Sequence, residues 1–413
     1  MFACPMPTLQ PPPRDRPRYE LKLDVSRDFK RVDGELKVRF TPNRDTDRLV
    51  FRLWPNGPSQ LEEGSRLDVR DETVDGVRVA ARRPDPTTLI IDRPLRRGES
   101  VTAHMSWRLR VPANVDDRIA RFRNGLRLGS FFPILAWDER RGWATDPPTR
   151  VLAETSTSPT ADFDVRVTLP KGTKALVSGT SVGRDHWHAH AVRDVGVAVA
   201  RFRTATAVTQ LQHRVTVRVG VAGRFQRPEL ALRLATAALR HYSQTYGNYP
   251  WQTFTLVVVP DLVNEGIEYP TLVFVARGSM EKLVVHHETA HQWFYSLVGN
   301  NQARDPWLDE ALATWAQERL DGIDGEGFYG PAHHVGAPMT FWARKARRYY
   351  REVYGGGPEA LRSLHAPAKV DCALRLYVAH DAYRIAVPAD LLDVLDRVIP
   401  GASDRLRRFG IHR

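Results

Sequence analysis

His287-Glu288-Thr289-Ala290-His291 is the stretch from which the rest of this chain can be interpreted. Histidines four positions apart lie on one face of a helix, one turn from each other, so both imidazole rings can reach a single metal ion. The glutamate after the first histidine can take a proton from a water molecule at that metal. Hydrophobic residues on both sides of the motif predict a helix packed in a core: Leu283, Val284, Val285, Trp293, Phe294 and Leu297.

A third metal ligand is predicted at Glu310, which follows His291 after eighteen intervening residues. A catalytic zinc site has three protein ligands and keeps one position open for water. The sequence therefore predicts one Zn²⁺ per chain, held by His287, His291 and Glu310, with Glu288 as the catalytic base. His286 is predicted to be structural, because adjacent residues of a helix do not face one point.

Composition places the chain among globular proteins of more than one domain. The 413 residues are 42% hydrophobic and 26% charged, which are ordinary values. The sequence contains no run of 18 apolar residues, so no membrane span is predicted. The formal net charge is +12, but the arginines are spread along the chain and do not cluster with aromatic residues. This distribution favours a solvated basic surface over a nucleic-acid-binding site.

Residues 1–14 are rich in proline and are predicted to be a disordered leader. A small residue precedes Cys4, as at a lipoprotein cleavage site, but the hydrophobic stretch of a signal peptide is missing. Cys4 is therefore interpreted as incidental, and together with Cys372 it predicts neither a disulfide framework nor a cysteine metal site. Localisation stays open: the chain as given fits the cytoplasm, and a start further upstream would fit an exported or lipid-anchored protein.

The first half of the sequence alternates polar and apolar residues, as half-buried strands do. This pattern occurs at 21–25, 35–40, 101–109 and 163–169. Asp33-Gly34 and Asp75-Gly76 are interpreted as tight turns between strands. Many short strands at such spacing predict an antiparallel β saddle or sandwich, which we place at residues 15–205.

The second half, residues 206–413, is predicted to be mostly helical, so the whole chain is assigned to the α+β multidomain class. Apolar residues at 231, 234, 235, 238 and 242 form a helical stripe that begins at Pro228. Residues 254–259 form a continuous apolar run that suits a strand. Further helices are predicted around His287, near 306–320, and from Pro388 onward.

These motifs resemble the aminopeptidase N family of gluzincin metallopeptidases. The resemblance rests on the stretch from His287 to Phe294, on Trp307-Leu308-Asp309-Glu310-Ala311-Leu312-Ala313, and on the spacing between the second histidine and Glu310. It covers most of the chain and implies an N-terminal β saddle followed by a thermolysin-like catalytic domain. It also implies that the third and fourth domains of larger members are absent.

The resemblance implies two further site residues. Glu265-Gly266-Ile267-Glu268-Tyr269-Pro270 is similar to the family's Gly-x-Met-Glu-Asn exopeptidase motif, with Glu268 at the glutamate position and Glu265 at the leading glycine. A carboxylate there can bind a free α-ammonium group through a charge-assisted hydrogen bond and so exclude internal peptide segments. Tyr354, before Gly355-Gly356-Gly357, is the best match to the tyrosine that stabilises the oxyanion, and its rivals are Tyr349, Tyr350 and Tyr377.

The sequence therefore predicts a zinc-dependent aminopeptidase that acts on peptides with a free N-terminus. Two alternatives stay open: a thermolysin-like endopeptidase, against which Glu268 argues, and a non-catalytic zinc-binding scaffold for peptides, against which Glu288 argues. Neither the side-chain preference of the substrate nor the oligomeric state is indicated. How Glu265 and the glycines after Tyr354 affect activity is also open.

Overall fold

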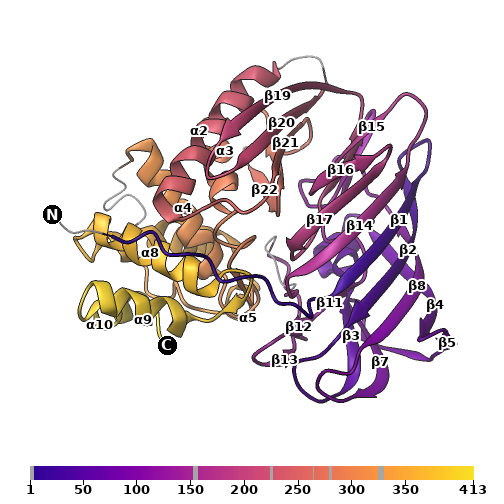
Figure 1. Ribbon diagram of the computed structural model, residues 1–413, viewed down its shortest axis with the longest axis horizontal. Helices are drawn as coiled ribbons and strands as arrows, with labels where there is room; N and C mark the ends of the chain where they lie inside the picture. The colour runs from indigo at the N-terminus through magenta and orange to yellow at the C-terminus, as the bar shows by residue number, and fades with distance from the viewer. Residues whose placement is uncertain (1–3, 152–156, 224–226, 264, 279–280, 324–329) are drawn as a thin grey trace.

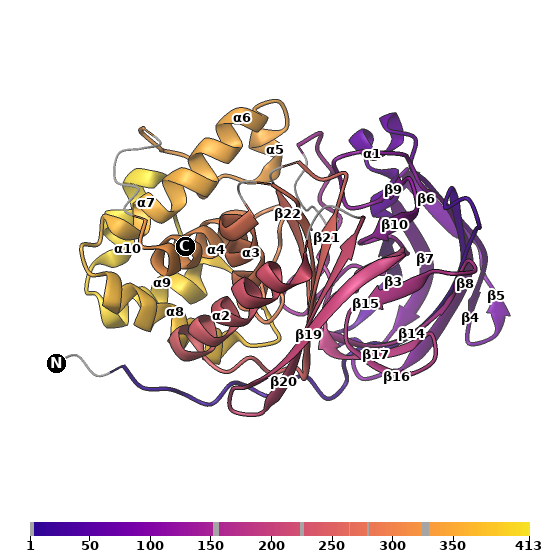
Figure 2. The ribbon, with the colours of Figure 1, turned by 90° about the horizontal axis from the view of Figure 1, so that it is seen from above.

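The computed structural model describes residues 4–151, 157–223, 227–263, 265–278, 281–323 and 330–413. Strands from the first half of the chain gather on one side of the molecule, and helices from the second half gather on the other (Figure 1). A further sheet lies between them when the molecule is seen from above (Figure 2). This arrangement confirms the predicted α+β class with a β-rich N-terminal region.

The N-terminal β region is built around a large sheet with the strand order β16-β17-β14-β1-β2-β8-β4-β5. Its strands alternate buried and exposed residues, which is why the sequence pattern predicted them. All the pairs are antiparallel except β1 with β14, which run parallel. The strands are β1 (Arg18–Val25), β2 (Arg31–Phe40), β4 (Arg66–Val74), β5 (Val77–Arg78), β8 (Val101–Arg110), β14 (Ala161–Thr168), β16 (Thr180–Gly183) and β17 (His186–Val192).

Smaller sheets pack with this one and complete the β region. They have the orders β15-β18-β10-β9, β11-β3-β7-β6 and β12-β13. Their strands are β3 (Thr46–Arg52), β6 (Ala81–Asp85), β7 (Thr88–Leu95), β9 (Ala120–Phe122), β10 (Gly125–Leu128), β11 (Ile134–Leu135), β12 (Trp137–Asp138), β13 (Gly142–Trp143), β15 (Lys174–Val177) and β18 (Val197–Ala200). Two short helical turns, η1 (Trp54–Asn56) and α1 (Pro58–Glu62), follow β3.

The turn predicted at Asp33-Gly34 is wrong. Gly34 lies inside β2, opposite Trp107 of β8. A Cβ atom on residue 34 would lie 2.1 Å from the Trp107 ring, so glycine is needed there to make room for the indole. The chain reverses earlier, at Ser26–Phe29, where the Phe29 amide donates to the Ser26 carbonyl.

The sheet between the two sides has the order β19-β20-β21-β23-β22 and leads into the helices. Its strands are β19 (Phe202–Gln210), β20 (Arg214–Ala222), β21 (Thr253–Val259), β22 (Gly266–Tyr269) and β23 (Leu272–Ala276). Helix α2 (Pro228–Tyr246) begins and ends where the sequence predicted, and the apolar stripe at Ala231, Ala235, Ala238 and Tyr242 is buried. The boundary between two domains that the sequence predicted at residues 205 and 206 stays a prediction. Strand β19 runs across that position.

The helices of the second half surround α3 (Glu281–Ala290) and α4 (Trp307–Asp321), which contact each other. Helix α3 ends at Ala290, so His291 begins a turn rather than continuing a longer helix, although its amide still bonds to the His287 carbonyl. The other elements are α5 (Met339–Trp342), α6 (Ala346–Tyr349), the π-helical turn η2 (Tyr350–Gly355), α7 (Gly356–Arg362), α8 (Pro367–Asp381), α9 (Pro388–Val398), α10 (Ala402–Leu406), η3 (Arg407–Phe409) and the short parallel pair β24 (Gly299–Asn300) and β25 (Ile385–Ala386).

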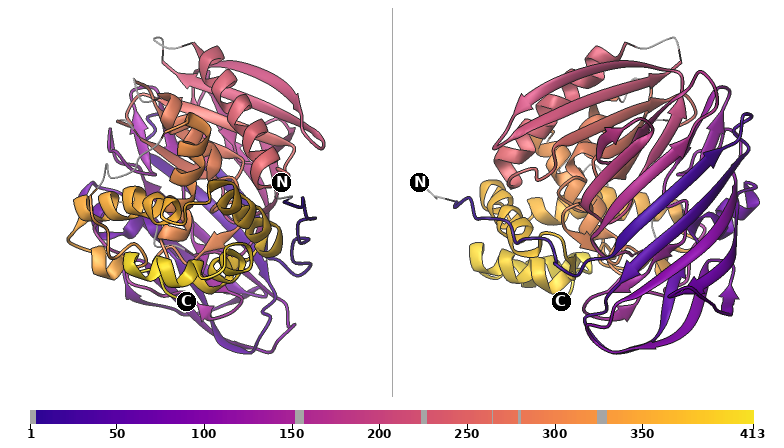
Figure 3. Two further views of the ribbon diagram at one scale, coloured as in Figure 1. Left: turned by 90° about the vertical axis from the view of Figure 1, so that its left-hand side faces the viewer. Right: turned by 45° about the vertical axis from the view of Figure 1, so that its right-hand side comes forward.

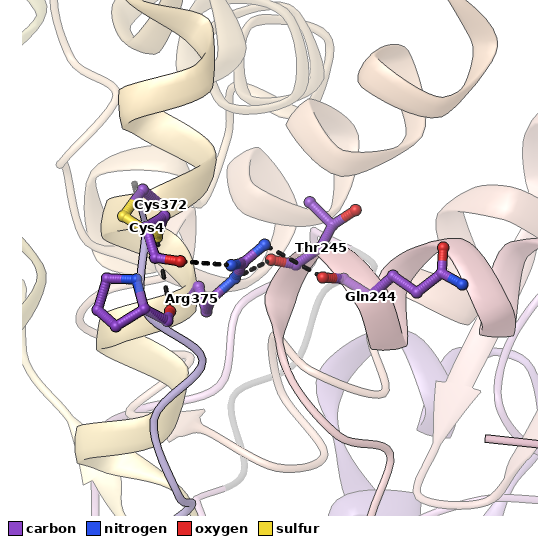
Figure 4. The surroundings of a disulfide bond; sticks show 6 residues. Cys4, Gln244, Thr245, Cys372 and Arg375 are labelled. Atoms are coloured by element: carbon purple, nitrogen blue, oxygen red, sulfur yellow. Dashed lines mark hydrogen bonds between the residues drawn. A yellow bond between two sulfur atoms is a disulfide. The ribbon is translucent and has the colours of Figure 1, made fainter. Parts of the chain in front are cut away.

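The N-terminal segment differs from the predicted disordered leader. Residues 1–3 lie outside the described residues, but 4–14 run along α8 toward the β region (Figures 1 and 3). A disulfide joins Cys4 to Cys372 of α8, and the Gln10 amide donates to the Ala379 carbonyl. Arg375 donates to the carbonyls of Cys4, Gln244 and Thr245 (Figure 4).

The interpretation of Cys4 as incidental is therefore wrong, because its sulfur is bonded to a partner far away in the sequence. Spacing in the sequence could not predict this pair, since the two cysteines stand 368 residues apart. Within the described part of the chain, none of the helices is both long and apolar enough to cross a membrane.

Candidate metal centre

Three donor atoms from α3, the turn after it and α4 meet at one point. His287 Nε2 and His291 Nε2 lie 3.1 Å apart. Glu310 Oε2 lies 3.3 Å from the first of these nitrogens and 3.4 Å from the second. The structure thus brings together the three ligands that the sequence predicted, although they come from different elements.

The spacing of these donors fits a zinc ion. Zinc ligands of the nitrogen and oxygen type bind at about 2.0–2.1 Å in a tetrahedral array, which sets them about 3.3 Å apart. The three measured separations lie within a few tenths of an ångström of that value. Two imidazoles and a carboxylate are also a donor set that zinc accepts in catalytic sites.

The predicted ligands His287 and Glu310 are held in the protonation states that metal binding needs. Burial lowers the pKa of His287, which favours the neutral ring. Burial alone would raise the pKa of Glu310, but its hydrogen bonds with His287 and His291 lower it below the ordinary value. Glu310 therefore remains a carboxylate at neutral pH.

Asp309 orients His291, a role that the sequence did not reveal. Its Oδ1 atom lies 2.7 Å from His291 Nδ1, and the Phe294 carbonyl lies 3.0 Å from the same nitrogen. Contacts of this kind fix which ring nitrogen carries the proton and leave Nε2 for the metal. Gln302 donates to the other oxygen of Asp309 at 2.8 Å, so the carboxylate itself is held in place. The only signal for Asp309 was its position next to Glu310.

A cavity of about 440 Å³ opens beside the three donors. Its lining includes Glu288 of α3 and Glu268 of β22, both of them buried. Donor atoms of Glu268, Glu288 and His291 all lie within 4.8 Å of one another. Glu268 stands on the strand next to α3 in the fold, and this packing brings the two glutamates to the same wall of the cavity.

Glu288 packs closely against Gly266, two residues before Glu268. A Cβ atom on residue 266 would lie 2.3 Å from Glu288 Cγ and 2.6 Å from its Oε1. Glycine is therefore required at this position for the Glu288 side chain to lie where it does. Burial raises the pKa of Glu288 well above the ordinary value for a glutamate.

Tyr354 follows the three donors in the sequence and lies in the π-helical turn η2. Its ring stacks on the His287 ring, with 5.9 Å between the ring centroids. It lines the cavity, as does its rival Tyr350. The other two rivals, Tyr349 and Tyr377, are buried and do not line the cavity. Burial raises the pKa of Tyr354 well above that of an ordinary tyrosine, so its hydroxyl keeps the proton that a hydrogen-bond donor needs.

Part of the cavity wall comes from the β region, which no sequence motif indicated. Asp116, Asp117 and Arg118 line the cavity together with Glu265. Arg118 Nη1 donates to the Tyr269 hydroxyl at 3.2 Å, and its Nη2 lies 3.9 Å from Glu268 Oε1. His286 faces away from the donors and pairs with Asp321 at 2.9 Å, as expected for a residue that is not a ligand.

Residues 230–326 match the sequence profile of the Peptidase family M1 domain. This part of the chain is therefore similar to peptidase family M1 domains. This match covers α2 through α4 and therefore includes the three donors and both glutamates. The resemblance to the aminopeptidase N family that the motifs suggested is thereby confirmed.

Known relatives match short stretches of the chain. Aminopeptidase RNPEPL1 of Homo sapiens is 36% identical over 81 residues, which are 18% of this chain and 11% of that protein. Aminopeptidase B of Rattus norvegicus is 33% identical over 84 residues, 19% of this chain and 13% of that protein. The matches thus span only a small part of the length of these relatives.

Solved structures match almost the entire fold. The M1 zinc metallopeptidase from Deinococcus radiodurans superposes with a TM-score of 0.73 at 22% identity, covering 96% of this chain and 93% of that one. A mutant of a two domain M1 zinc metallopeptidase, bound to L-arginine, also has a TM-score of 0.73, at 21% identity, and covers 97% of this chain and 94% of that one. At these identities the likeness concerns the fold, and it includes the N-terminal β region as well as residues 230–326.

Proposed function

We propose that this chain is a zinc-dependent aminopeptidase that hydrolyses the first peptide bond of peptides with a free N-terminus. The observation that carries the proposal is the position of Glu268, whose carboxylate lies within 4.8 Å of donor atoms of both Glu288 and His291. A substrate ammonium group bound by Glu268 would place the adjacent peptide bond at the metal ligands. The names of the matched relatives, aminopeptidase RNPEPL1 and aminopeptidase B, agree with this proposal.

Each of the candidate site residues has a separate role in the proposed reaction. His287, His291 and Glu310 would hold one zinc ion, which supplies Lewis acidity that activates water and polarises a carbonyl group. Glu288 takes a proton from the attacking water and passes it to the leaving amine. The Tyr354 hydroxyl donates a hydrogen bond to the developing oxyanion. Glu268 accepts hydrogen bonds from the α-ammonium group and fixes where the substrate begins.

The proposal predicts that activity depends on a free N-terminus and on Glu268. The wild type should cleave an aminoacyl fluorogenic substrate and leave its N-acetylated counterpart intact. Glu268→Gln should lower kcat/KM for the free substrate about 10- to 100-fold, because a charge-assisted hydrogen bond becomes a neutral one. Steady-state kinetics on matched free and acetylated substrates measures both effects.

The same assay separates the two alternatives. Equal cleavage of acetylated and free substrates by the wild type would indicate an endopeptidase and would refute the role of Glu268. A second outcome would be one bound zinc ion per chain but no hydrolysis of any substrate in a panel that varies the N-terminal residue. This outcome would indicate a non-catalytic binding scaffold. Glu265→Gln is a suitable control variant, since Glu265 lines the cavity but lies outside the cluster of Glu268, Glu288 and His291.

A second prediction concerns Gly266, which is not itself expected to contact substrate. Gly266→Ala should lower kcat about 100-fold, because the added methyl group displaces the Glu288 carboxylate by about an ångström. Zinc content should stay unchanged, since Glu288 is not among the three predicted ligands.

Gly183→Ala is the matched control for this substitution. Gly183 is also in a strand, and a Cβ atom there would meet only the His186 side chain at 3.9 Å. Kinetics and zinc analysis of the two variants should therefore differ in kcat alone. Wild-type turnover by Gly266→Ala would show that the contact with Glu288 is unimportant.

A further inference from the structure

A row of histidines lies on the outer face of the β region, away from the candidate metal centre. His186, His188 and His190 occupy alternate positions of β17, and the residues between them, Trp187 and Ala189, are buried. Alternate residues of a strand point to the same face of a sheet. The three imidazoles therefore lie on one side of β17, and the hydrophobic residues between them anchor the strand.

Asp164 of the neighbouring strand β14 faces two of these histidines. It is the register partner of His188 across the antiparallel pair. His188 Nε2 lies 2.6 Å from Asp164 Oδ2, and His186 Nε2 lies 2.8 Å from the same oxygen. Ligand atoms of all three side chains fall within 4.8 Å of one another.

We propose that Asp164, His186 and His188 form a second metal site, which binds a divalent transition-metal ion such as Zn²⁺. Two imidazoles and one carboxylate are a common donor set for such ions and leave further positions to water. Donors bound to one zinc ion are about 3.3 Å apart, so the present contacts of 2.6 and 2.8 Å need to open by about 0.5 to 0.7 Å.

The surroundings allow this movement and the entry of an ion. The side chains of His186, Asp164 and His188 are 17%, 30% and 55% exposed. Arg166 contacts the other carboxylate oxygen, Asp164 Oδ1, at 3.6 Å, and its own side chain is 58% exposed, so it can turn toward solvent. A bound ion would cross-link β14 and β17 near the end of the large sheet.

His190 is excluded from the site by its neighbour. His190 Nδ1 lies 3.1 Å from Asp162 Oδ1, but the Arg16 guanidinium pairs with the same carboxylate at 2.8 Å and approaches His190 Nδ1 to 3.3 Å. A metal cation there would be repelled by that charge. His190 therefore serves as a control: it has the same residue type, strand and face, but it stands outside the proposed donor set.

Metal analysis of the 413-residue chain after equilibrium dialysis against low-micromolar Zn²⁺ tests the proposal. The wild type and His190→Ala should bind about one zinc ion per chain more than His186→Ala, His188→Ala and Asp164→Asn. Zinc should also raise the thermal unfolding midpoint of the first two proteins above that of the other three. The test compares the zinc content of the variants with that of the wild type. The difference in zinc content therefore does not depend on whether zinc is bound at His287, His291 and Glu310.

Equal zinc content in the wild type and in a His186→Ala/His188→Ala double variant would overturn the proposal. Loss of the additional ion in His190→Ala would overturn the assignment of the donors. Circular dichroism of the metal-free proteins should be the same for all variants, because the substituted side chains lie on the outer face of the sheet. Peptidase activity should not change in any of them, and a parallel loss of activity would contradict a separate site.

Discussion

Replacing Glu288 with glutamine is expected to abolish peptide hydrolysis while zinc stays bound. The Glu288 carboxylate is buried beside the metal ligands, and its Oε2 atom makes no hydrogen bond within the described residues. A carboxylate in this position is available to a water molecule, whereas an amide cannot accept the proton. Loss of general acid–base catalysis should lower kcat at least about 10³-fold.

Glutamine is the right substitution because it keeps the volume of the side chain that packs on Gly266. Zinc content measured on the same preparation separates loss of the base from loss of the metal, since the predicted ligands His287, His291 and Glu310 are untouched. Retained turnover in a zinc-replete Glu288→Gln protein would refute the assigned mechanism. Glu265→Gln, at the same cavity, should keep most of the activity of the wild type.

Removing the Cys4–Cys372 disulfide is expected to lower the free energy of unfolding by about 2–4 kcal/mol. The cross-link closes a loop across 368 residues and so restricts the unfolded chain strongly. The Cys4→Ser/Cys372→Ser double variant keeps the hydrogen bonds from Arg375 to the carbonyl of residue 4 and from Gln10 to Ala379, which then hold the N-terminal segment on α8 without the disulfide. Urea unfolding of the wild type and the double variant measures the difference.

A reducing agent provides the internal control for this prediction. It should lower the unfolding midpoint of the wild type toward that of the double variant and leave the double variant unchanged. Activity in the absence of denaturant should be similar in all samples, because neither cysteine lines the cavity. An unfolding midpoint that is the same with and without the disulfide would contradict a stabilising role.

The structure shows where local sequence patterns are sufficient and where they fail. The stripe that predicted α2 and the alternation that predicted β1, β8 and β14 were correct, because each pattern reports which face of an element is buried. The dipeptide Asp33-Gly34 was misread as a turn, because glycine there serves a contact with Trp107 of another strand. A dipeptide carries no information about such a distant neighbour.

By itself, the sequence determined the chemistry of the candidate centre. The repeat of an α-helix places His287 and His291 on one face wherever the helix packs, and the motif spacing pointed to Glu310, Glu268 and Tyr354. Only the tertiary structure decided that Arg118 of the β region lines the same cavity, that Asp309 orients His291, and that Cys4 reaches Cys372. It also decided that Asp164 faces two histidines across a pair of strands. Those contacts join segments that are distant in the sequence, so they depend on the packing of the entire chain, which periodicity and spacing do not encode.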